Sequence, residues 1–356
     1  MKNKILKTVI SGFTILLLAA CGSDQTSSTP SNEKVQLTMN SQFATVHHIH
    51  RNVYEPFLKI VDEKTNGQVS VELHPNSALG APDTSYDDIK NGVYDVGMIT
   101  ATNALNTPFF PYTIGTLPFA FPDLETAYNV LEKFEVKHPP KKANQDLYNL
   151  GPVALTEPQT IFSRTPIKSV EDLKGMKIAF QGGKGIEKLV TSWGATPVVI
   201  KGVDVYQALE RGVVDASLYT VLGGMGSKIH EVGPYLLDLN IFNTPLITVM
   251  SKDVYERMPD NVKEAFDNEI SGQVPTMYKG SYDSELAKAK EQLTQELEGK
   301  GGWIKLSPEE EAKIKLGAKA AWDAWIEEAN KKGYDGEQLV ADFKEILKEE
   351  GVELPF

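Results

Sequence analysis

The chain of 356 residues contains a single cysteine, Cys21, so it cannot form a disulfide within itself or a cysteine-rich zinc site. Beyond residue 20, no apolar run approaches the ~20 residues that a membrane-spanning helix needs. Signatures of catalysis are also scarce. The sequence has no Gly-x-Ser-x-Gly motif, and the glycine-rich stretch Gln181–Gly185 has neither the phosphate-loop nor the dinucleotide-binding spacing. We therefore expect no catalytic residues and no cofactor.

Basic residues are outnumbered: 36 Lys and Arg stand against 48 Asp and Glu, a net charge of −12. Without the three lysines of residues 1–20, the balance is 33 against 48, a net −15. So negative a surface repels phosphate backbones, which makes nucleic acid a poor partner. The composition, 41% hydrophobic and 24% charged, is typical of a globular protein. The length suits two lobes with separate cores.

The N-terminus has the order of a secretory signal: Lys2, Lys4 and Lys7 precede the largely apolar stretch Val9–Ala20. Cys21 follows at once in Leu-Ala-Ala-Cys-Gly, which resembles the lipobox of bacterial lipoproteins and argues against a short transmembrane anchor. The resemblance implies a signal peptide over residues 1–20 and acylation of the Cys21 sulfur, which would hold the protein at the lipid bilayer. Residues 21–34 would be a flexible, Ser/Thr-rich tether. We therefore expect an extracytoplasmic, lipid-anchored protein that folds from about Val35.

The folded part begins with alternating strands and helices, which predicts a parallel sheet with crossover helices. Strands are expected over 35–39, 69–73 and 93–99, and the same alternation returns at 153–155, 160–162, 176–180, 197–200 and 213–217. A further strand is expected at 247–250, and a long polar helix at 286–297. Small ligands bind beyond the carboxyl ends of parallel strands. The candidate pocket loops are therefore Asn40–His48, Thr100–Asn106, Gln181–Gly183 and Tyr219–Gly224.

Histidines cluster at His47, His48 and His50. Neighbouring histidines on a loop point apart, whereas a metal site needs convergent ligands, so no metal site is expected here. Contact with a ligand at the mouth of the first strand and simple solvation both remain open. The turn Gln181–Gly183, followed by Lys184, is likewise either an anion contact at a helix start or a plain turn.

Several segments, in order, resemble the solute-binding proteins of tripartite ATP-independent periplasmic (TRAP) transporters, the DctP-type family. The resemblance covers roughly residues 35–300. The segments that carry it are Phe57–Val69, Asn76–Gly80, Asn91–Asp95, Leu117–Phe121, Pro166–Ile178, Trp193–Val198 and Val205–Asp215.

The family resemblance implies an α/β, two-lobed, periplasmic-binding-protein-like fold with hinge strands and a long helix that spans both lobes. It implies closure around a small organic acid and delivery of that acid to the membrane permease subunits of a TRAP transporter. The expected division is 35–155 with 251–285 for one lobe, 156–250 with 305–356 for the other, and 286–304 for the spanning helix and its turn.

In the family, an arginine that clamps the ligand carboxylate stands at the position of Ala179. An alanine cannot replace a planar, bidentate guanidinium. Either another cation, Arg164 or Lys184, takes over, or the ligand is not a carboxylate bound in the usual way. If Glu157 faces the cleft, it would favour a cationic or hydroxyl-rich ligand. The expected ligand contacts are Phe43, His47, Thr100, Thr102, Glu157, Arg164, Ala179, Gln181, Gly182, Lys184, Tyr219 and Thr244.

Three alternatives to an organic-acid receptor stay open at this stage. The same fold could bind a neutral or cationic metabolite. A secreted two-lobed enzyme would need convergent acid, base or nucleophile groups. An adhesion or scaffold lipoprotein would need a large exposed apolar face.

Overall fold

The computed structural model describes residues 34–356. The predicted signal peptide, Cys21 and the predicted tether up to residue 33 lie outside the described residues, so these expectations stay untested.

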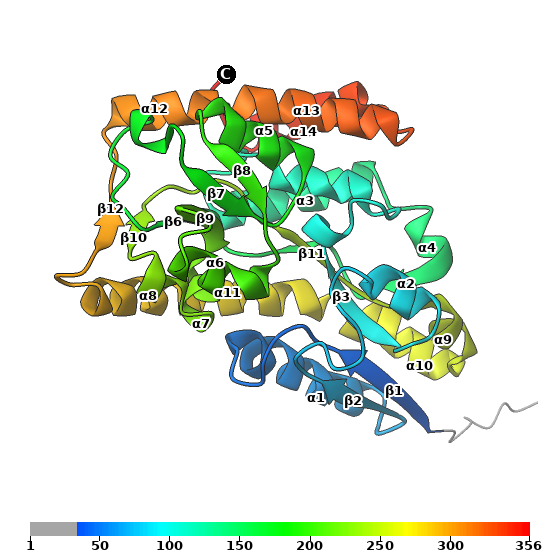
Figure 1. Cartoon of the computed structure of the whole chain (residues 1–356). Coiled ribbons are helices and arrows are strands. Elements are labelled where there is room, and N and C mark those ends of the chain that lie inside the picture. The colour runs from blue at the N-terminus through cyan, green and yellow to red at the C-terminus, as the bar shows by residue number, and fades with distance from the viewer. Residues whose placement is uncertain (1–33) are drawn as a thin grey trace, which may run out of the picture. The chain divides into compact units, whose positions relative to one another are not determined.

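Two mixed sheets organise the described residues (Figure 1). Sheet A has the order β2-β1-β3-β11-β4, with β5 also paired to β11, and sheet B has the order β12-β10-β6-β9-β7-β8. The strands of sheet A are β1 (Val35–Asn40), β2 (Val69–His74), β3 (Val96–Thr100), β4 (Leu147–Asn149), β5 (Ala154–Leu155) and β11 (Pro245–Ser251). Those of sheet B are β6 (Gln159–Ser163), β7 (Lys177–Phe180), β8 (Thr196–Val199), β9 (Ala216–Thr220), β10 (Tyr235–Leu237) and β12 (Gly302–Ile304).

Each sheet contains a parallel trio, as the β-α-β pattern predicts: β2-β1-β3 in sheet A and β8-β7-β9 in sheet B. The helices are α1 (Glu55–Lys64), α2 (Ser85–Lys90), α3 (Leu124–Lys137), α4 (Ala143–Asp146), α5 (Lys184–Ser192), α6 (Val205–Glu210), α7 (Val221–Gly226), α8 (Ile229–Val232), α9 (Lys252–Arg257), α10 (Asp260–Ala265), α11 (Gln273–Glu296), α12 (Pro308–Leu316), α13 (Ala318–Lys331) and α14 (Gly336–Glu349). Short 3₁₀ and π turns fill several connections, among them η1 (His50–Tyr54), η2 (Ala101–Asn103) and η3 (Phe110–Thr116).

Two antiparallel segments cross between the sheets, residues 156–158 and residues 238–244, and backbone hydrogen bonds join them. Thr156 donates its N–H to the Thr244 carbonyl at 3.0 Å, and Gln159 donates to Phe242 at 2.7 Å. The Asn243 amide adds a bond to the Thr156 carbonyl at 2.9 Å. These crossings divide the fold into a sheet A lobe and a sheet B lobe joined by a hinge, which confirms the predicted two-lobed α/β architecture.

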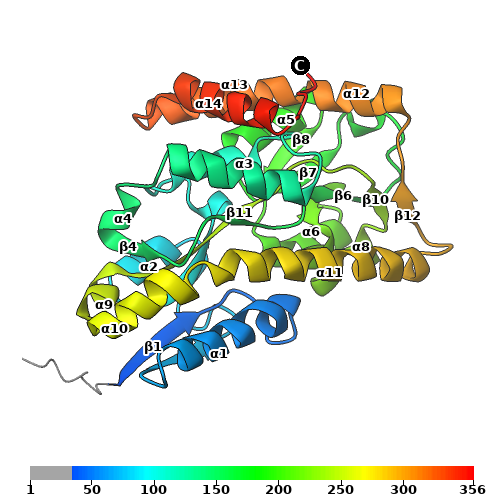
Figure 2. The same cartoon turned by 180° about the vertical axis from the view of Figure 1, so that it is seen from behind.

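The long helix α11 spans both lobes, but it begins at Gln273, whereas the sequence pattern predicted a helix over 286–297, within the segment 286–304 expected to hold the spanning helix and its turn. Pro275 lies in the first turn, where proline is tolerated, and Gly280 does not interrupt the helix. Tyr278 and Tyr282 pack into the core of the sheet A lobe, and Leu293 into the core of the sheet B lobe. Figure 2 shows α11 running from the neighbourhood of α10 to that of β12.

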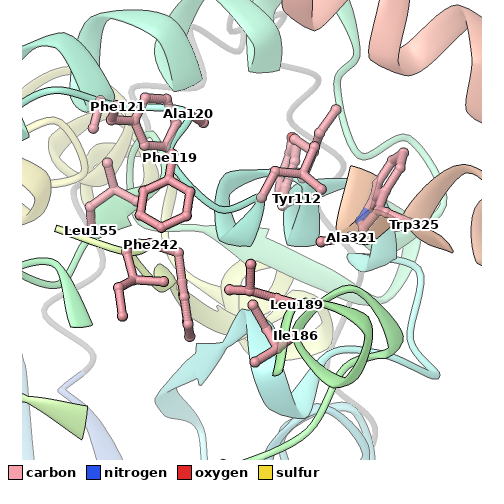
Figure 3. Close-up of a cluster of buried hydrophobic side chains, with 14 of the residues drawn as sticks. Tyr112, Phe119, Ala120, Phe121, Leu155, Ile186, Leu189, Phe242, Ala321 and Trp325 are labelled. Atoms are coloured by element: carbon pink, nitrogen blue, oxygen red, sulfur yellow. The ribbon is translucent and has the colours of Figure 1, made fainter. Parts of the chain in front are cut away.

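The core consists of three clusters. The sheet A cluster includes Leu37, Tyr54, Phe57, Tyr278 and Tyr282. The sheet B cluster includes Phe162, Ala179, Val205, Leu209 and Leu293. A larger bridging cluster joins side chains of the 109–121 segment, α3, α5, α13 and α14, and Figure 3 shows part of it. In it, the indole N–H of Trp325 donates to the Thr113 hydroxyl at 2.8 Å and that of Trp322 to the Pro118 carbonyl at 3.1 Å.

Two strands begin three residues later than the pattern predicted, since β3 begins at Val96 instead of residue 93 and β9 at Ala216 instead of residue 213. β9 covers Ala216–Thr220, whereas the apolar pair Val213-Val214 suggested 213–217. Gly212 has a positive φ of +69° and begins a turn, and Val213 and Val214 both donate their N–H groups to the Ala208 carbonyl. The shift matters because it places Tyr219 inside the carboxyl end of the strand, at the edge where ligands are expected.

Candidate functional site

The carboxyl ends of the parallel strands of the two sheets face each other. Lys201, after β8, forms an ion pair with Asp83, before α2, at 3.6 Å. Gly182, after β7, lies so near Leu105, after β3, that a Cβ on the glycine would be 3.9 Å from the leucine methyl. These two contacts show the loops of the sheet B lobe against those of the sheet A lobe. The candidate site is the edge at which these loops meet.

On the sheet A side, the loop after β1 holds a row of three stacked or tilted rings. The ring centres of Phe43 and His47 are 4.3 Å apart, and those of His47 and His48 are 4.4 Å apart. The Nδ1 of His47 accepts the backbone N–H of Ile49 at 3.2 Å, and the Nδ1 of His48 is 2.7 Å from the Ser281 hydroxyl. The loop predicted to reach the ligand is therefore ordered by its own contacts and by α11.

Both imidazoles are held neutral. Burial, assisted by the neighbouring His48 and His50, lowers the pKa of His47 to about 3. Burial also lowers the pKa of His48 to about 4, although the Glu285 carboxylate acts in the opposite direction. Because the Nδ1 of neutral His47 accepts a hydrogen bond, its proton sits on Nε2. The loop thus offers an N–H donor without a positive charge.

Thr100, Thr102 and Thr244 lie near the same edge, but their hydroxyls are partly engaged. Thr100 accepts the Asn103 side-chain amide at 2.7 Å and the Thr102 hydroxyl at 3.4 Å. Thr244 belongs to the hinge, where its hydroxyl accepts the Gln159 amide at 3.4 Å and its backbone N–H donates to Thr156.

On the sheet B side, Ala179 has no exposed surface and packs into the sheet B cluster. Ala179 pairs with Ser217 across the parallel ladder, so Ala179, Gln181 and Tyr219 project from the same face of the sheet. The sequence therefore places a tyrosine ring and an amide beside the alanine, at the end of the strand that faces the other lobe.

Two glycines make room for Tyr219. A Cβ on Gly223 would stand 2.9 Å from the Tyr219 ring, and a Cβ on Gly202 would stand 3.0 Å from its hydroxyl and 3.4 Å from the Gln181 amide nitrogen. The hydroxyl lies 3.5 Å from the Gly202 carbonyl. Burial raises the pKa of Tyr219, opposed by a hydrogen bond to Ser227, so the phenol stays protonated and polar but uncharged.

Neither of the two cations predicted as substitutes for the family arginine lies beside Ala179 and Tyr219. Arg164 follows the end of β6 that pairs with the start of β9, and its guanidinium lies over Gly212. That position is at the opposite end of sheet B from Tyr219. Lys184 is exposed at the start of α5, where it forms an ion pair with Glu187 at 2.6 Å.

Glu157 lies in the hinge and is 1% exposed. One carboxylate oxygen accepts the backbone N–H of Leu222 at 2.9 Å. Burial raises the pKa of this carboxyl to about 7, while the bonds from Leu222, Thr220 and Gly223 act against the rise. Its carboxylate is thus turned toward α7 rather than presented free to a ligand.

Sequence reasoning missed Gly202 as part of this edge, and it placed His48 and Gly223 in candidate pocket loops without giving either a role. Glycines after strands were a visible signal, but their role depends on where the tyrosine ring lies. It also missed an open groove of about 720 Å³ between η1 and α11, lined by Arg51, Asn52, Pro56, Met277, Gly280, Ser281, Ser284, Glu285 and Lys288.

Taken together, the facing loops offer aromatic rings, hydroxyls, amides and a neutral imidazole. Within residues 34–356, no group of three or more His, Cys, Asp or Glu side chains converges as metal ligands would. In the same range, no helix combines the length and apolarity needed to cross a membrane. Such groups can bind and orient a small organic molecule by stacking and hydrogen bonds.

Comparison with known proteins agrees with this arrangement. Residues 39–329 match the family model of the bacterial extracellular solute-binding proteins, family 7, known as DctP. The chain is 25% identical to the C4-dicarboxylate-binding periplasmic protein DctP of Rhodobacter capsulatus over 221 residues, 60% of this chain and 65% of that protein. It is likewise 25% identical to the 2,3-diketo-L-gulonate-binding periplasmic protein YiaO of Escherichia coli over 213 residues, 59% of this chain and 64% of that protein.

Among solved structures, a TRAP solute-binding protein from a marine metagenome, specific for aromatic acid ligands, superposes with a TM-score of 0.78 at 25% identity. The match covers 90% of this chain and 100% of that one, which was crystallised with 3-hydroxybenzoate. A TRAP protein of Rhodoferax ferrireducens reaches a TM-score of 0.76 at 20% identity, over 89% and 99% of the two chains. That second likeness bears on the fold alone.

The fold, the facing loops and these matches show that the chain is a solute-binding protein of a transport system rather than an enzyme. More narrowly, the chain belongs to family 7 of the bacterial extracellular solute-binding proteins, the DctP-type receptors of TRAP transporters. Such receptors act outside the cytoplasm, bind small organic acids and work with membrane permease subunits.

Proposed function

We propose that this chain captures a small aromatic monocarboxylate between the loops of its two lobes and closes over it. The lobes are those carrying sheets A and B, joined by the hinge segments and by α11. The aromatic residues Phe43 and Tyr219 supply the surfaces on which a ligand ring can stack, one from each lobe. The metagenomic relative that binds aromatic acids supports this class, since its fold matches over nearly the whole chain.

The observation that carries the proposal is that the buried Ala179 projects from the same face of sheet B as Tyr219. Where the family resemblance places a guanidinium, this chain has a methyl group with no exposed surface, beside a phenol seated between two glycines. The carboxylate is therefore met by neutral donors, namely the Nε2–H of His47, the Gln181 amide and the Tyr219 hydroxyl. Neutral donors bind a carboxylate less strongly than a bidentate arginine does, so a moderate affinity follows.

The proposed ligand contacts are narrower than those expected from the sequence. We retain Phe43, His47, Thr100, Thr102, Gln181, Gly182 and Tyr219. Arg164 is left out because it lies at the other end of sheet B, and Thr244 because it is bonded within the hinge. Ala179 acts by its small size, Glu157 acts within the hinge, and Lys184 lies outside the contact set because its charge is offset by Glu187.

The test is a thermal denaturation series with 3-hydroxybenzoate and its neutral counterpart 3-hydroxybenzyl alcohol, followed by calorimetric titration. The acid is expected to raise the melting temperature increasingly with concentration. Tyr219→Ala should abolish this rise, whereas Val213→Ala, an exposed change on the turn before β9, should leave it unchanged. A rise with the alcohol and none with the acid would replace this ligand class by a neutral one.

We also propose that the protein is anchored to the membrane through an acylated Cys21. The support is the sequence alone: a basic and then apolar leader followed at once by the single cysteine. In cells fed labelled palmitate, the wild-type protein should carry the label and stay with the membrane fraction. Cys21→Ser should lose both. An unlabelled wild-type protein would exclude the anchor without touching the ligand proposal.

A further inference from the structure

A buried carboxylate ties the hinge to the sheet B lobe. Glu157 lies between β5 and β6, on the segment that crosses from one lobe to the other. One of its oxygens accepts the Leu222 N–H at 2.9 Å, and Thr220 and Gly223 also donate toward this carboxylate. The contact therefore joins the crossing segment to the start of α7.

Helix α7 touches both lobes through one residue. Leu222 packs against the sheet B cluster and also against the sheet A cluster, which contains Tyr54 and Tyr282. Leu222 thus lies where the cores of the two lobes meet. Because Leu222 also donates its N–H to Glu157, a lobe movement that shifts Leu222 would change the surroundings of the carboxylate.

Among the described residues, the groups that interact with Glu157 come from α7, the residue before it and α11, and none of these groups is positively charged. From α7 and the residue before it come backbone N–H groups and the Thr220 hydroxyl. From α11 comes Tyr282, whose pKa is raised well above its usual value by burial, with the Glu157 charge as the next cause. Tyr128 of α3 acts on Tyr282 in the same direction, and His48 packs edge-on against the Tyr282 ring at 5.2 Å.

We propose that Glu157 is a proton-linked switch in the hinge, protonated when the lobes are closed and ionised when opening lets water reach it. Raising the pH then favours the open form, and lowering the pH favours the closed form. The device depends on the hinge and not on which ligand the cleft takes, so it stands apart from the proposed function.

The direction of this pH dependence follows from which form of the protein, closed or open, binds the proton of Glu157 more tightly. In this compact form burial raises the pKa of Glu157 from 4.5 to about 7. In an opened, hydrated hinge the pKa returns toward its ordinary value. Between these two values the closed form holds more protons, so the ratio of closed to open protein falls by up to about tenfold for each unit of rising pH. His47 and His48 do not share this window, because their pKa values lie at about 3 and about 4.

The experiment measures the distance between the rims of the lobes in ligand-free protein. Val46 and Val203 are each 87% exposed, on the loops after β1 and β8, so cysteines there can carry spin labels in a Cys21→Ser background. Distance distributions are recorded by pulsed electron resonance from about pH 5.5 to about pH 8.5. Over this range, the ratio of closed to open protein should fall about tenfold or more. In Glu157→Gln, the closed fraction should be insensitive to pH.

Glu135→Gln is the matched control. Burial also raises the pKa of Glu135, and its carboxylate accepts the Val153 N–H at 2.9 Å, but it lies on α3 and not in the crossing segment. This variant should keep the wild-type pH dependence. A wild-type distribution that does not change with pH would overturn the proposal, as would a dependence that persists in Glu157→Gln or disappears in Glu135→Gln.

A second variant covers the case in which Glu157→Gln does not fold. Thr220→Val keeps the carboxyl group but removes a hydroxyl that favours its ionised form. The midpoint of the pH dependence should then move to higher pH. An unmoved midpoint would contradict the assignment of the switch to Glu157.

Discussion

The Lys201 ammonium lies 3.6 Å from the Asp83 carboxylate and so joins the rim of the sheet B lobe to the rim of the sheet A lobe. Both side chains are largely exposed, which limits the strength of the pair and makes it sensitive to salt. Lys201→Gln should weaken binding of 3-hydroxybenzoate about twofold to fivefold at low ionic strength. Titrations at about 0.02 M and about 0.5 M salt check this. An equal loss at both salt concentrations would show that the ion pair does not assist closure.

A second prediction concerns the space around Ala179. Ala179→Arg places a guanidinium into the apolar sheet B cluster, so the free energy of unfolding should fall by about 3–5 kcal/mol. Adding Tyr219→Ala should recover part of this loss, because removing the ring opens a route for the new side chain. Thr196→Arg, on the exposed side of the neighbouring strand, is the control and should cost little. Denaturant unfolding of the wild type, the two single variants and the double variant measures these free energies. A stable Ala179→Arg protein would mean that the position opens into the cleft.

The imidazoles of the loop after β1 should remain uncharged well below neutral pH. Burial holds the pKa values of His47 and His48 at about 3 and about 4. Nitrogen-detected spectra of the histidine side chains should therefore show both rings neutral at about pH 6, with the proton of His47 on Nε2. Signals of a protonated imidazole from His47 at that pH would remove it as a neutral donor to the ligand.

The free energy of unfolding should depend on pH in part through Glu157. Its pKa is raised in the folded protein, so its contribution is fully present below about pH 4.5 and is lost as the pH rises through about 7. The loss amounts to at most about 3 kcal/mol. His47 and His48 act in the opposite direction, because lowered pKa values make their contribution disappear as the pH falls below about 6.5.

Comparison of unfolding free energies for wild type and Glu157→Gln isolates the Glu157 contribution. The difference between the two proteins should grow as the pH is lowered from about 8 toward about 5, with the wild type gaining stability relative to the variant. A difference that is constant with pH would contradict the raised pKa of Glu157.

The sequence predicted the fold better than it predicted the site. Alternating apolar residues marked β1 and β2 correctly. The long helix was placed too late, because the residues before Leu286 include Pro275 and Gly280 and lack a clear apolar stripe. The short strands β4, β10 and β12 gave no pattern, since three residues are too few to show a period.

Site residues depend on which end of a strand they occupy and on partners far away in the chain. Arg164 and Lys184 are close to Ala179 in sequence, but β6 runs antiparallel to β9, so the end of β6 carries Arg164 away from the ligand edge. The seat of Tyr219 needs Gly202 and Gly223, and the burial of Glu157 needs Leu222. None of these contacts has a local signature that sequence reading could have used.

The most direct test of closure over a small acid is the rim distance between labels at positions 46 and 203, measured as 3-hydroxybenzoate is added. The distribution should shift to the shorter distance and saturate at the ligand concentration at which calorimetric binding saturates. A ligand that binds by calorimetry and leaves the rim distance unchanged would contradict the account.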